Sequence, residues 1–487
     1  MQKITSTTID PSPPPSSPEP KYKIGLCLSG GGYRATAYHL GTLRKLREMG
    51  ILHDIDVIST VSGGSITGAL YAIEGEDFTQ FEKKLLTGVK RSVIRHILLT
   101  PQFILVGLAV LSWLAFLIYL DFLGNPIIPL LLFTLLIVFL GYFQFEILPI
   151  SRWVESAYRR FFFGRKTLDK MPNFVHLVIN ATNLDTGRPF TFSRDEMDDS
   201  TYSYRNGQKQ AVFTTQGFPV ARAVAASSCV PFAFSPIKIA KRFFVDHQAF
   251  MDDQKDEPAE GKGNNKATQP RIVDGGVYDN QGLHCVTWKN RASYCKDAII
   301  VSDAGNRMPF QHRYPNIITL LIRTSDVFMR RIKNLQMIKE LYYSFGHPEY
   351  QTAYQSMGWD CDKSIDGFLK RLKNDQISES VWKKHGLTQA IVNGIKNGDK
   401  TLIKQAEGIL KASINYAEIL KQAPTQEELK IARTVATNLV PLSDAQISAL
   451  TKQAATMTEI QVRLFCPNIV PPKRTPESAT TTPELRD

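Results

Sequence analysis

The chain has 487 residues, 43% of them hydrophobic, which is enough for one large core or two ordinary ones. Lysine and arginine outnumber aspartate and glutamate by 58 to 46, and the net charge of +12 favours a partner with an anionic surface, either nucleic acid or anionic lipid. The six cysteines form no C-x-x-C pair and do not cluster with histidines, which excludes a recognisable zinc motif and predicts reduced, structural thiols.

Both ends of the chain are expected to be disordered tails. Residues 1–21 are rich in proline and serine and lack the continuous apolar stretch that a secretory signal needs. We predict a second tail over residues 473–487.

The first folded part, residues 22–97, alternates between strand and helix patterns. An apolar run over 23–30 predicts a buried strand, and the amphipathic stretch 35–50 predicts a helix. A second short strand is expected over 55–60, and a further helix starts just after Ser62. This order is the opening of a parallel α/β sheet.

Residues 98–149 form a strongly hydrophobic block. Two apolar runs of roughly 18 to 22 residues are separated only by DFLGNP, and at about 1.5 Å of rise per residue each can cross a hydrocarbon core of about 30 Å. Within these runs and the turn, the only charge is Asp121. We therefore predict a transmembrane helical hairpin inserted into a globular domain. The alternative, a helix pair buried in a soluble core, would normally show a polar face.

Basic residues flank this block on both sides. By the positive-inside tendency both ends of the hairpin lie in the cytoplasm, which predicts an integral membrane protein with its catalytic domain on the cytoplasmic side. Residues 150–170 mix aromatic residues with arginines, as expected for a segment at the level of the lipid headgroups, and a soluble surface helix is the alternative. Because the basic residues gather at these flanks, we do not expect nucleic acid as a partner. The flanking residues are Lys83, Lys84, Lys90, Arg91 and Arg95 before the block, and Arg152, Arg159, Arg160, Arg165 and Lys166 after it.

After the hairpin, residues 171–314 contain further short apolar runs. A polar, glycine-rich stretch over 254–270 predicts a mobile surface loop. Residues 315–472 have a helical pattern and carry no residues that predict catalysis. We expect further strands over 174–184, 188–193, 243–250, 271–276 and 298–305.

Ser62 lies in the stretch STVSGGSITG, between a β-branched run and two glycines. A serine nucleophile must be exposed on a sharp turn, and in a strand-to-helix elbow its neighbours must be small because strand and helix nearly touch. Gly63 and Gly64 meet this demand, whereas Thr60 replaces the first glycine of the usual G-x-S-x-G pattern. The alternative is that Ser62 only caps the helix that follows it.

The glycine run Gly30, Gly31 and Gly32 follows the first predicted strand and opens a helix. Its backbone N–H groups can point at one anion, as an oxyanion hole requires. The same run also fits the dinucleotide-binding pattern G-x-G-x-x-G/A, with Asp54 and Asp56 about twenty residues further on. The run alone does not decide between these two functions.

Asp274 ends an apolar strand and precedes two glycines. Aspartate before glycine is commonly a plain turn, but a strand-end carboxylate opposite a serine can act as general base without a histidine. A Ser-His-Asp hydrolase would instead use His284 or His312, and Asp246 is an alternative base.

Together these stretches resemble the patatin-like phospholipase family, whose pattern is a G-G-G-x-R oxyanion loop, a serine elbow and a D-G-[GA] aspartate. Residues 221–237 also resemble the family's A-S-x-x-x-P-x-x-F segment, so that four ordered blocks span residues 24 to about 305. The matching residues are Gly30, Gly31, Gly32 and Arg34 in the loop, Ser62, Gly63 and Gly64 in the elbow, Asp274, Gly275 and Gly276 at the aspartate, and Ala226, Ser227, Pro231 and Phe234 in the fourth block.

The resemblance implies a three-layer α/β/α fold with a mostly parallel central sheet. It also implies a lipid acyl hydrolase, phospholipase A-like or lysophospholipase-like, that needs neither metal nor cofactor. Ser62 would attack the ester carbonyl, Asp274 would take its proton, the amides of residues 30–32 would bind the oxyanion, and Arg34 would lie behind the loop. The implied partners are a membrane lipid substrate and the bilayer around residues 98–149. The alternative is a catalytically inactive lipid-binding or nucleotide-binding protein on a related α/β fold.

Overall fold

The computed structural model describes most of the chain. The predicted tails, most of the predicted loop over 254–270, and the candidate residues Asp246 and His312 lie outside the described residues. The described ranges are 22–124, 126–199, 213–231, 234–245, 269–289, 291, 293–306, 313–343 and 350–472.

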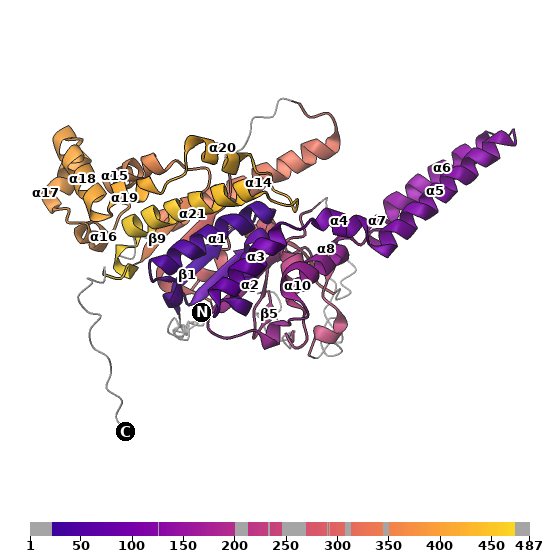
Figure 1. Cartoon of the computed structure of the whole chain (residues 1–487), viewed down its shortest axis with the longest axis horizontal. Coiled ribbons are helices and arrows are strands. Elements are labelled where there is room, and N and C mark those ends of the chain that lie inside the picture. The colour runs from indigo at the N-terminus through magenta and orange to yellow at the C-terminus, as the bar shows by residue number, and fades with distance from the viewer. Residues whose placement is uncertain are drawn as a thin grey trace, which may run out of the picture.

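A sheet of nine described strands runs through the middle of the molecule (Figure 1). Its main order is β5-β4-β3-β2-β1-β8-β9, and the β6–β7 pair joins it through β3. The strands from β3 to β9 along this order are parallel, whereas β4, β5, β6 and β7 are antiparallel additions. The strands are β1 (Tyr22–Leu28), β2 (Val57–Val61), β3 (His176–Asn183), β4 (Arg188–Phe192), β5 (Met197–Asp198), β6 (Ile237–Lys238), β7 (Arg271–Asp274), β8 (Cys295–Asp303) and β9 (Gln351–Ser356).

Helices cover both faces of this sheet, which confirms the predicted α/β architecture. On one face, α1 (Gly32–Glu48) and α2 (Gly63–Glu74) share a core with the long C-terminal helix α21 (Asp444–Phe465), and α1 and α21 lie side by side in Figure 1. On the other face, α13 (His284–Thr287) and α14 (Ile317–Tyr343) pack on a smaller cluster of strand residues. The central strands β1 and β2 are mostly apolar and are buried from Ile24 and Val57 onwards, because strands covered on both faces have no solvent side.

Two local predictions differ from the structure. The strand expected over 243–250 is wrong in its described part, where Lys241–Phe243 forms a 3₁₀ turn and Val245 lies in a turn. The C-terminal region is helical as predicted, but it also contributes β9, which extends the sheet beside β8. The remaining α-helices are α3 (Phe78–Val89), α4 (Val93–Leu98), α7 (Gln144–Ile147), α10 (Val220–Ser227), α12 (Gly276–Asp279), α15 (Ser364–Lys373), α16 (Glu379–Lys384), α17 (Gln389–Asn397), α18 (Lys400–Ser413), α19 (Tyr416–Lys421) and α20 (Gln426–Thr434), besides three described below.

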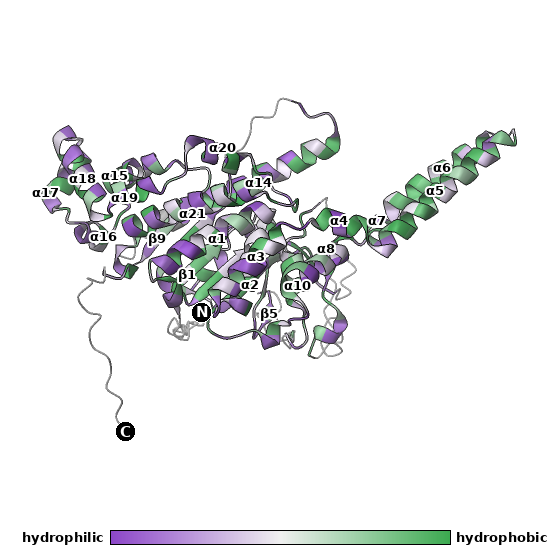
Figure 2. Cartoon of the chain, in the orientation of Figure 1, coloured by the Kyte–Doolittle hydropathy of each residue, from purple (hydrophilic) through white to green (hydrophobic). Residues whose placement is uncertain are grey.

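Helices α5 (Pro101–Phe122) and α6 (Ile127–Tyr142) form an antiparallel pair that projects from the domain (Figure 1). Helix α5 is long and apolar enough to cross a membrane, and only 6% of its most apolar 18 residues are buried. Helix α6 has 16 residues and meets the same criteria only together with Gln144–Phe163, after a bend of 74°. Figure 2 shows apolar residues along both helices. The described residues thus contain one helix that can span a membrane, or two if the bent pair is one span.

The segment after the hairpin is more buried than expected. Helix α8 (Ile150–Tyr158) and the π-helical turn Arg159–Phe163 direct their aromatic side chains into the protein core, and α8 packs on α10. The basic side chains of the same segment remain exposed. Tyr158, Phe162 and Phe163 thus pack into the protein, whereas Trp153 packs on Phe103 of α5 and the basic side of the segment faces outwards. The position of this segment at the lipid headgroups stays a prediction.

Candidate active site

Ser62 lies on the sharp turn between β2 and α2, with φ 50° and ψ −117°. This conformation is strained for a residue with a side chain, and such strain is typical of functional sites. The Ser62 side chain makes no capping hydrogen bond to α2, so the alternative of a simple helix cap is not supported. The geometry is that of a nucleophile elbow.

The glycines around Ser62 allow three backbone segments to meet. A Cβ added to Gly63 would lie 2.1 Å from the carbonyl oxygen of Gly32, and one added to Gly64 would lie 2.3 Å from that of Leu28. Both contacts are with backbone, so any side chain here would push the elbow away from the glycine loop.

Thr60 replaces the first glycine of the usual elbow pattern. It fits because the residue of α2 that faces it is a glycine, Gly68. A Cβ added to Gly68 of α2 would lie 2.4 Å from the Thr60 Cγ2 atom. The Thr60 hydroxyl donates to the Val178 carbonyl at 3.2 Å and accepts from the Ser65 hydroxyl at 3.0 Å. Gly68 thus provides the room for close packing that a glycine at position 60 would otherwise provide.

Ser227 fixes the backbone of the elbow. The Ser62 amide donates to the Ser227 hydroxyl at 2.8 Å, and that hydroxyl donates to the Asn180 carbonyl at 2.6 Å. Ser227 is fully buried at the end of α10, within the fourth block of the sequence pattern. The sequence marked this residue as part of a motif but gave no sign that it would bind the amide of Ser62.

The glycine loop lies directly beside Ser62. A Cβ added to Gly30 would lie 3.2 Å from the Ser62 Cβ, and Gly31 and Gly32 have φ values of 145° and 58°, which favour glycine. The Gly30 amide donates to the Asn280 carbonyl at 3.0 Å and is therefore occupied. Within the described part of the chain, the amides of Gly31 and Gly32 have no acceptor, which leaves these two of the three predicted donors available.

A C-terminal segment, residues 435–442, covers the outer side of this loop. The Tyr33 amide donates to the Asn438 carbonyl at 2.9 Å, and that oxygen lies only 2.3 Å from a Cβ added to Gly32. Arg34, half-buried just after the loop, donates to the Val435 carbonyl at 3.2 Å, and loss of solvent around its guanidinium lowers the pKa of that group. Nothing local in the sequence indicated that this distant segment touches the loop.

Asp274 ends β7 and is 4% exposed. Its Oδ1 atom accepts from the Gly276 amide at 2.6 Å, and a Cβ added to Gly275 would lie 2.4 Å from the Asn180 carbonyl oxygen. Burial raises the pKa of Asp274 to about 7, while hydrogen bonds from the Gly276 amide and the Ser62 side chain oppose this rise. The structure therefore brings the Ser62 hydroxyl and the Asp274 carboxyl together.

The described alternatives to this pair are not at the site. His284 packs against Tyr278 and Trp288, and burial lowers its pKa to about 4. The Asp56 carboxylate accepts from the amides at the start of β1, whereas the glycine loop follows the end of that strand. A dinucleotide bound at the loop would therefore not reach the acidic residue that its ribose needs.

A family model described as patatin-like phospholipase matches residues 26–284, which is more than half of the chain. The chain belongs to the patatin-like phospholipase family. The matched range includes the glycine loop, the elbow, Ser227 and Asp274, together with the whole projecting hairpin.

Similarity to curated patatin-like proteins is confined to short segments. The chain is 50% identical over 58 residues to the lysophospholipase NTE1 of Mycosarcoma maydis, which is 12% of this chain and 3% of that protein. It is 50% identical over 54 residues to the patatin-like phospholipase domain-containing protein ZK370.4 of Caenorhabditis elegans, 11% of this chain and 4% of that protein. The chain thus matches only a small fraction of the length of these relatives.

Solved structures show a more distant similarity to this patatin-like chain. Human GIVD cytosolic phospholipase A2 is 14% identical with a TM-score of 0.36, over 58% of this chain and 43% of that chain. VipD from Legionella pneumophila is 12% identical with a TM-score of 0.29, over 95% of this chain and 94% of that chain. Similarities this distant add nothing to what the family match establishes.

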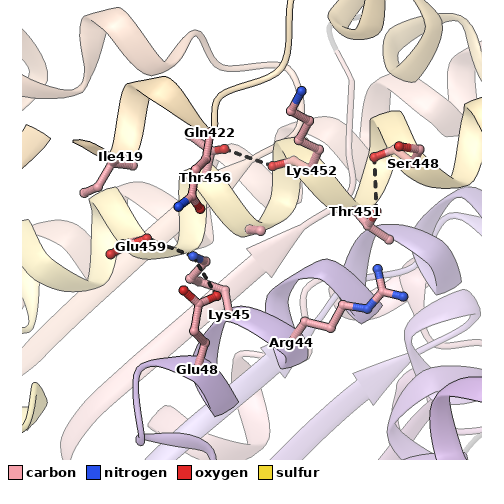
Figure 3. A pocket seen from close by; sticks show the side chains of 11 residues that line it. Arg44, Lys45, Glu48, Ile419, Gln422, Ser448, Thr451, Lys452, Thr456 and Glu459 are labelled. Carbon is pink, nitrogen blue, oxygen red and sulfur yellow. Dashed lines mark hydrogen bonds and ion pairs between the residues drawn. The ribbon is translucent and has the colours of Figure 1, made fainter. Parts of the chain in front are cut away.

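A separate polar pocket of about 290 Å³ lies between α1, α19 and α21 of the patatin-like chain (Figure 3). Lys45 lies between Glu48 and Glu459 there, at 2.9 and 3.0 Å, and the pKa of its ammonium is raised because these two carboxylates outweigh the lowering by burial. None of the residues that line this pocket belongs to the Ser62 site. Its central charges are already paired, so it offers no catalytic group.

Proposed function

We propose that this chain is a membrane-anchored lipid acyl hydrolase that cleaves carboxylic esters with a Ser62–Asp274 dyad. The observation that carries the proposal is a serine on a strained elbow whose side chain lowers the pKa of a buried carboxylate, beside two glycine amides that have no acceptor in the described chain. Membership of the patatin-like phospholipase family supports lipid esters as the substrate class.

In the proposed reaction, the Ser62 hydroxyl attacks the ester carbonyl while Asp274 accepts its proton. The negative charge that develops on the carbonyl oxygen is stabilised by the amides of Gly31 and Gly32, and removing one such donor typically costs about 10²- to 10³-fold in rate. The protonated Asp274 then donates to the departing alcohol, which leaves an acyl group on Ser62. Water hydrolyses this acyl-enzyme, with Asp274 again taking the proton.

The buried position of Asp274 suits it to this work. An ordinary aspartate is too weak a base to take a proton from serine, whereas a carboxylate whose pKa is raised to about 7 is a stronger base and is still about half ionised at neutral pH. Its bond to the Gly276 amide holds the carboxylate in one orientation.

The membrane part of the proposal rests on the α5–α6 pair. Most apolar side chains of both helices are exposed in the described protein, and a bilayer would remove them from water. Basic residues on both flanks support a hairpin whose two ends lie in the cytoplasm. The catalytic domain is then held next to its lipid substrate, so that the substrate need not leave the bilayer.

The catalytic proposal is tested by incubating the purified protein with a fluorophosphonate probe and with a mixed lipid extract. We expect covalent labelling in proportion to enzyme and release of fatty acid, identified by mass spectrometry, and neither with Ser62→Ala. A protein that binds vesicles but neither takes up the label nor releases fatty acid would be a lipid-binding protein, and the proposal would fail.

The anchoring proposal is tested by deleting residues 98–149. We expect the deleted protein to be soluble without detergent and to lose more turnover on vesicles than on a short soluble ester. Equal losses on the two substrates would contradict a role of the hairpin in reaching lipid.

A further inference from the structure

Helix α14 exposes apolar residues along its length, most densely at its beginning. Five of its first six residues are apolar and are 44% to 71% exposed. At about 100° per residue they cover an arc of about 200° around the helix. Farther along, Val327, Phe328, Leu335 and Ile338 continue the exposed apolar surface. The five residues at the beginning are Ile317, Ile318, Leu320, Leu321 and Ile322.

The opposite side of α14 is attached to the active-site end of the sheet. The Met329 Cε atom lies 2.9 Å from a Cβ added to Gly276, and Arg330 donates to the Asn306 carbonyl at 2.7 Å. Lys333 pairs with the buried carboxylate of Asp303 at the end of β8. The exposed apolar surface is thus fixed close to the turn that carries Asp274.

The charge of α14 favours an anionic surface. Between Ile317 and Lys339 the helix carries five basic residues and one acidic residue, Asp326. Arg330 and Lys333 bind the protein at Asn306 and Asp303, and Lys339 lies over the Trp288 ring, so Arg331 is the exposed basic residue without such a contact in the described helix. An apolar helix surface bordered by lysine and arginine is the pattern of helices that lie at the interface of anionic bilayers. A lipid surface covers the apolar residues and offers phosphate groups to the exposed Arg331.

A second copy of the chain fits this helix less well. A two-helix seam needs a narrow apolar stripe, whereas the beginning of α14 is apolar over an arc of about 200°. At heptad spacing from Ile317 and Leu321 the stripe takes in Phe328, Leu335 and Ile338. It also takes in Thr324 and the exposed Arg331, and these two polar positions interrupt it.

We infer that the exposed apolar surface of α14 inserts into the headgroup region of an anionic bilayer and thereby places the Ser62–Asp274 site over its lipid substrate. This second membrane contact is separate from the α5–α6 hairpin. It rests on the proposed function for the identity of the substrate, but the insertion itself does not depend on catalysis.

Insertion is measured on the full-length protein in liposomes of phosphatidylcholine with phosphatidylglycerol. All six cysteines are buried, so an environment-sensitive maleimide dye can be attached to Ile318→Cys, and to Lys404→Cys on exposed α18 as a matched control. We expect the dye at position 318 to shift to the blue and to be quenched by lipids that carry a spin label near the headgroup, whereas the dye at position 404 should do neither. Equal quenching at both positions would overturn the inference. So would a dye at position 318 that becomes shielded from solvent in detergent as the protein concentration rises, because that would indicate that a second copy of the chain covers α14.

Turnover gives an independent measurement. A double variant, Ile318→Ser with Leu321→Ser, changes only exposed side chains. We expect its turnover on the same vesicles to fall about tenfold and its hydrolysis of a short soluble ester to be unchanged. An unchanged vesicle rate would contradict the inference. If the unaltered protein hydrolyses neither substrate, the proposed function fails, and the quenching result still decides whether α14 inserts.

Discussion

Replacing Asp274 by asparagine should abolish activity and at the same time stabilise the protein at alkaline pH. Asparagine has nearly the same shape, and its side-chain oxygen can still accept from the Gly276 amide. The substitution therefore removes the charge and leaves the local geometry in place. Lower activity together with higher stability is the result expected when a catalytic group that destabilises the fold is replaced.

The size of the stabilisation follows from the pKa of Asp274. Burial raises it from 3.8 to about 7, so ionising this carboxyl opposes folding, and about 1.4 kcal/mol accompanies each unit of pKa. Below pH 3.8 the Asp274 carboxyl does not lower the free energy of unfolding. Between pH 3.8 and about 7 its ionisation lowers that free energy progressively, and above pH 7 the total loss is ~4 kcal/mol. Asparagine avoids this loss, so the expected gain is ~2 kcal/mol at pH 5 and ~4 kcal/mol at pH 8.

Thermal unfolding in detergent at both pH values measures the difference. With an unfolding entropy of about 2.1 cal/mol/K per residue, a chain of 487 residues changes its midpoint by about 1 °C per kcal/mol, so Asp274→Asn should melt ~2 °C higher at pH 5 and ~4 °C higher at pH 8. Asp303→Asn is the matched control, because Asp303 is equally buried but pairs with Lys333, which holds the pKa of Asp303 below its usual value. That variant should be destabilised at pH 8, since it leaves a lysine without its buried partner. A lower midpoint for Asp274→Asn, or a gain independent of pH, would refute the reasoning.

Three further predictions concern the elbow and its base. Gly63→Ala should destabilise the protein by ~1–3 kcal/mol and abolish hydrolysis, because its methyl group meets the Gly32 carbonyl, whereas Gly408→Ala in open space on α18 should be neutral or stabilising in the same thermal unfolding assay. Ser227→Ala should lower kcat on a short ester by about tenfold or more with intact folding by circular dichroism, since the Ser62 amide loses its acceptor; an unchanged kcat would remove Ser227 from the site. In a pH series, kcat/KM should rise with pH around a midpoint near 7 as Asp274 ionises, and a flat profile from pH 5 to 9 would place the base elsewhere.

The parts of the site that the sequence predicted are those formed by neighbouring residues. The glycine loop, the Ser62 elbow and the Asp274 turn each depend on small residues at fixed short spacings, and the structure places all three at one end of the sheet. The central strands are equally evident, because strands buried on both faces are mostly apolar.

The parts that were missed depend on contacts between distant segments. The contact between Asn438 and Gly32 uses a backbone carbonyl, which no side-chain pattern specifies. The aromatic residues of α8 and the following turn have the composition of an interfacial segment, and only the position of α10 shows that they are buried in the protein. The second apolar run has the composition of a membrane span, but its helix ends at Tyr142 and the chain then bends.

The contact between the glycine loop and residues 435–442 links the order of protein synthesis to catalytic competence. The ribosome produces the elbow, the hairpin and Asp274 long before it produces the segment that covers the loop. Under the proposed function, a growing chain would carry Ser62 and Asp274 while its glycine loop still lacks the contact with Asn438.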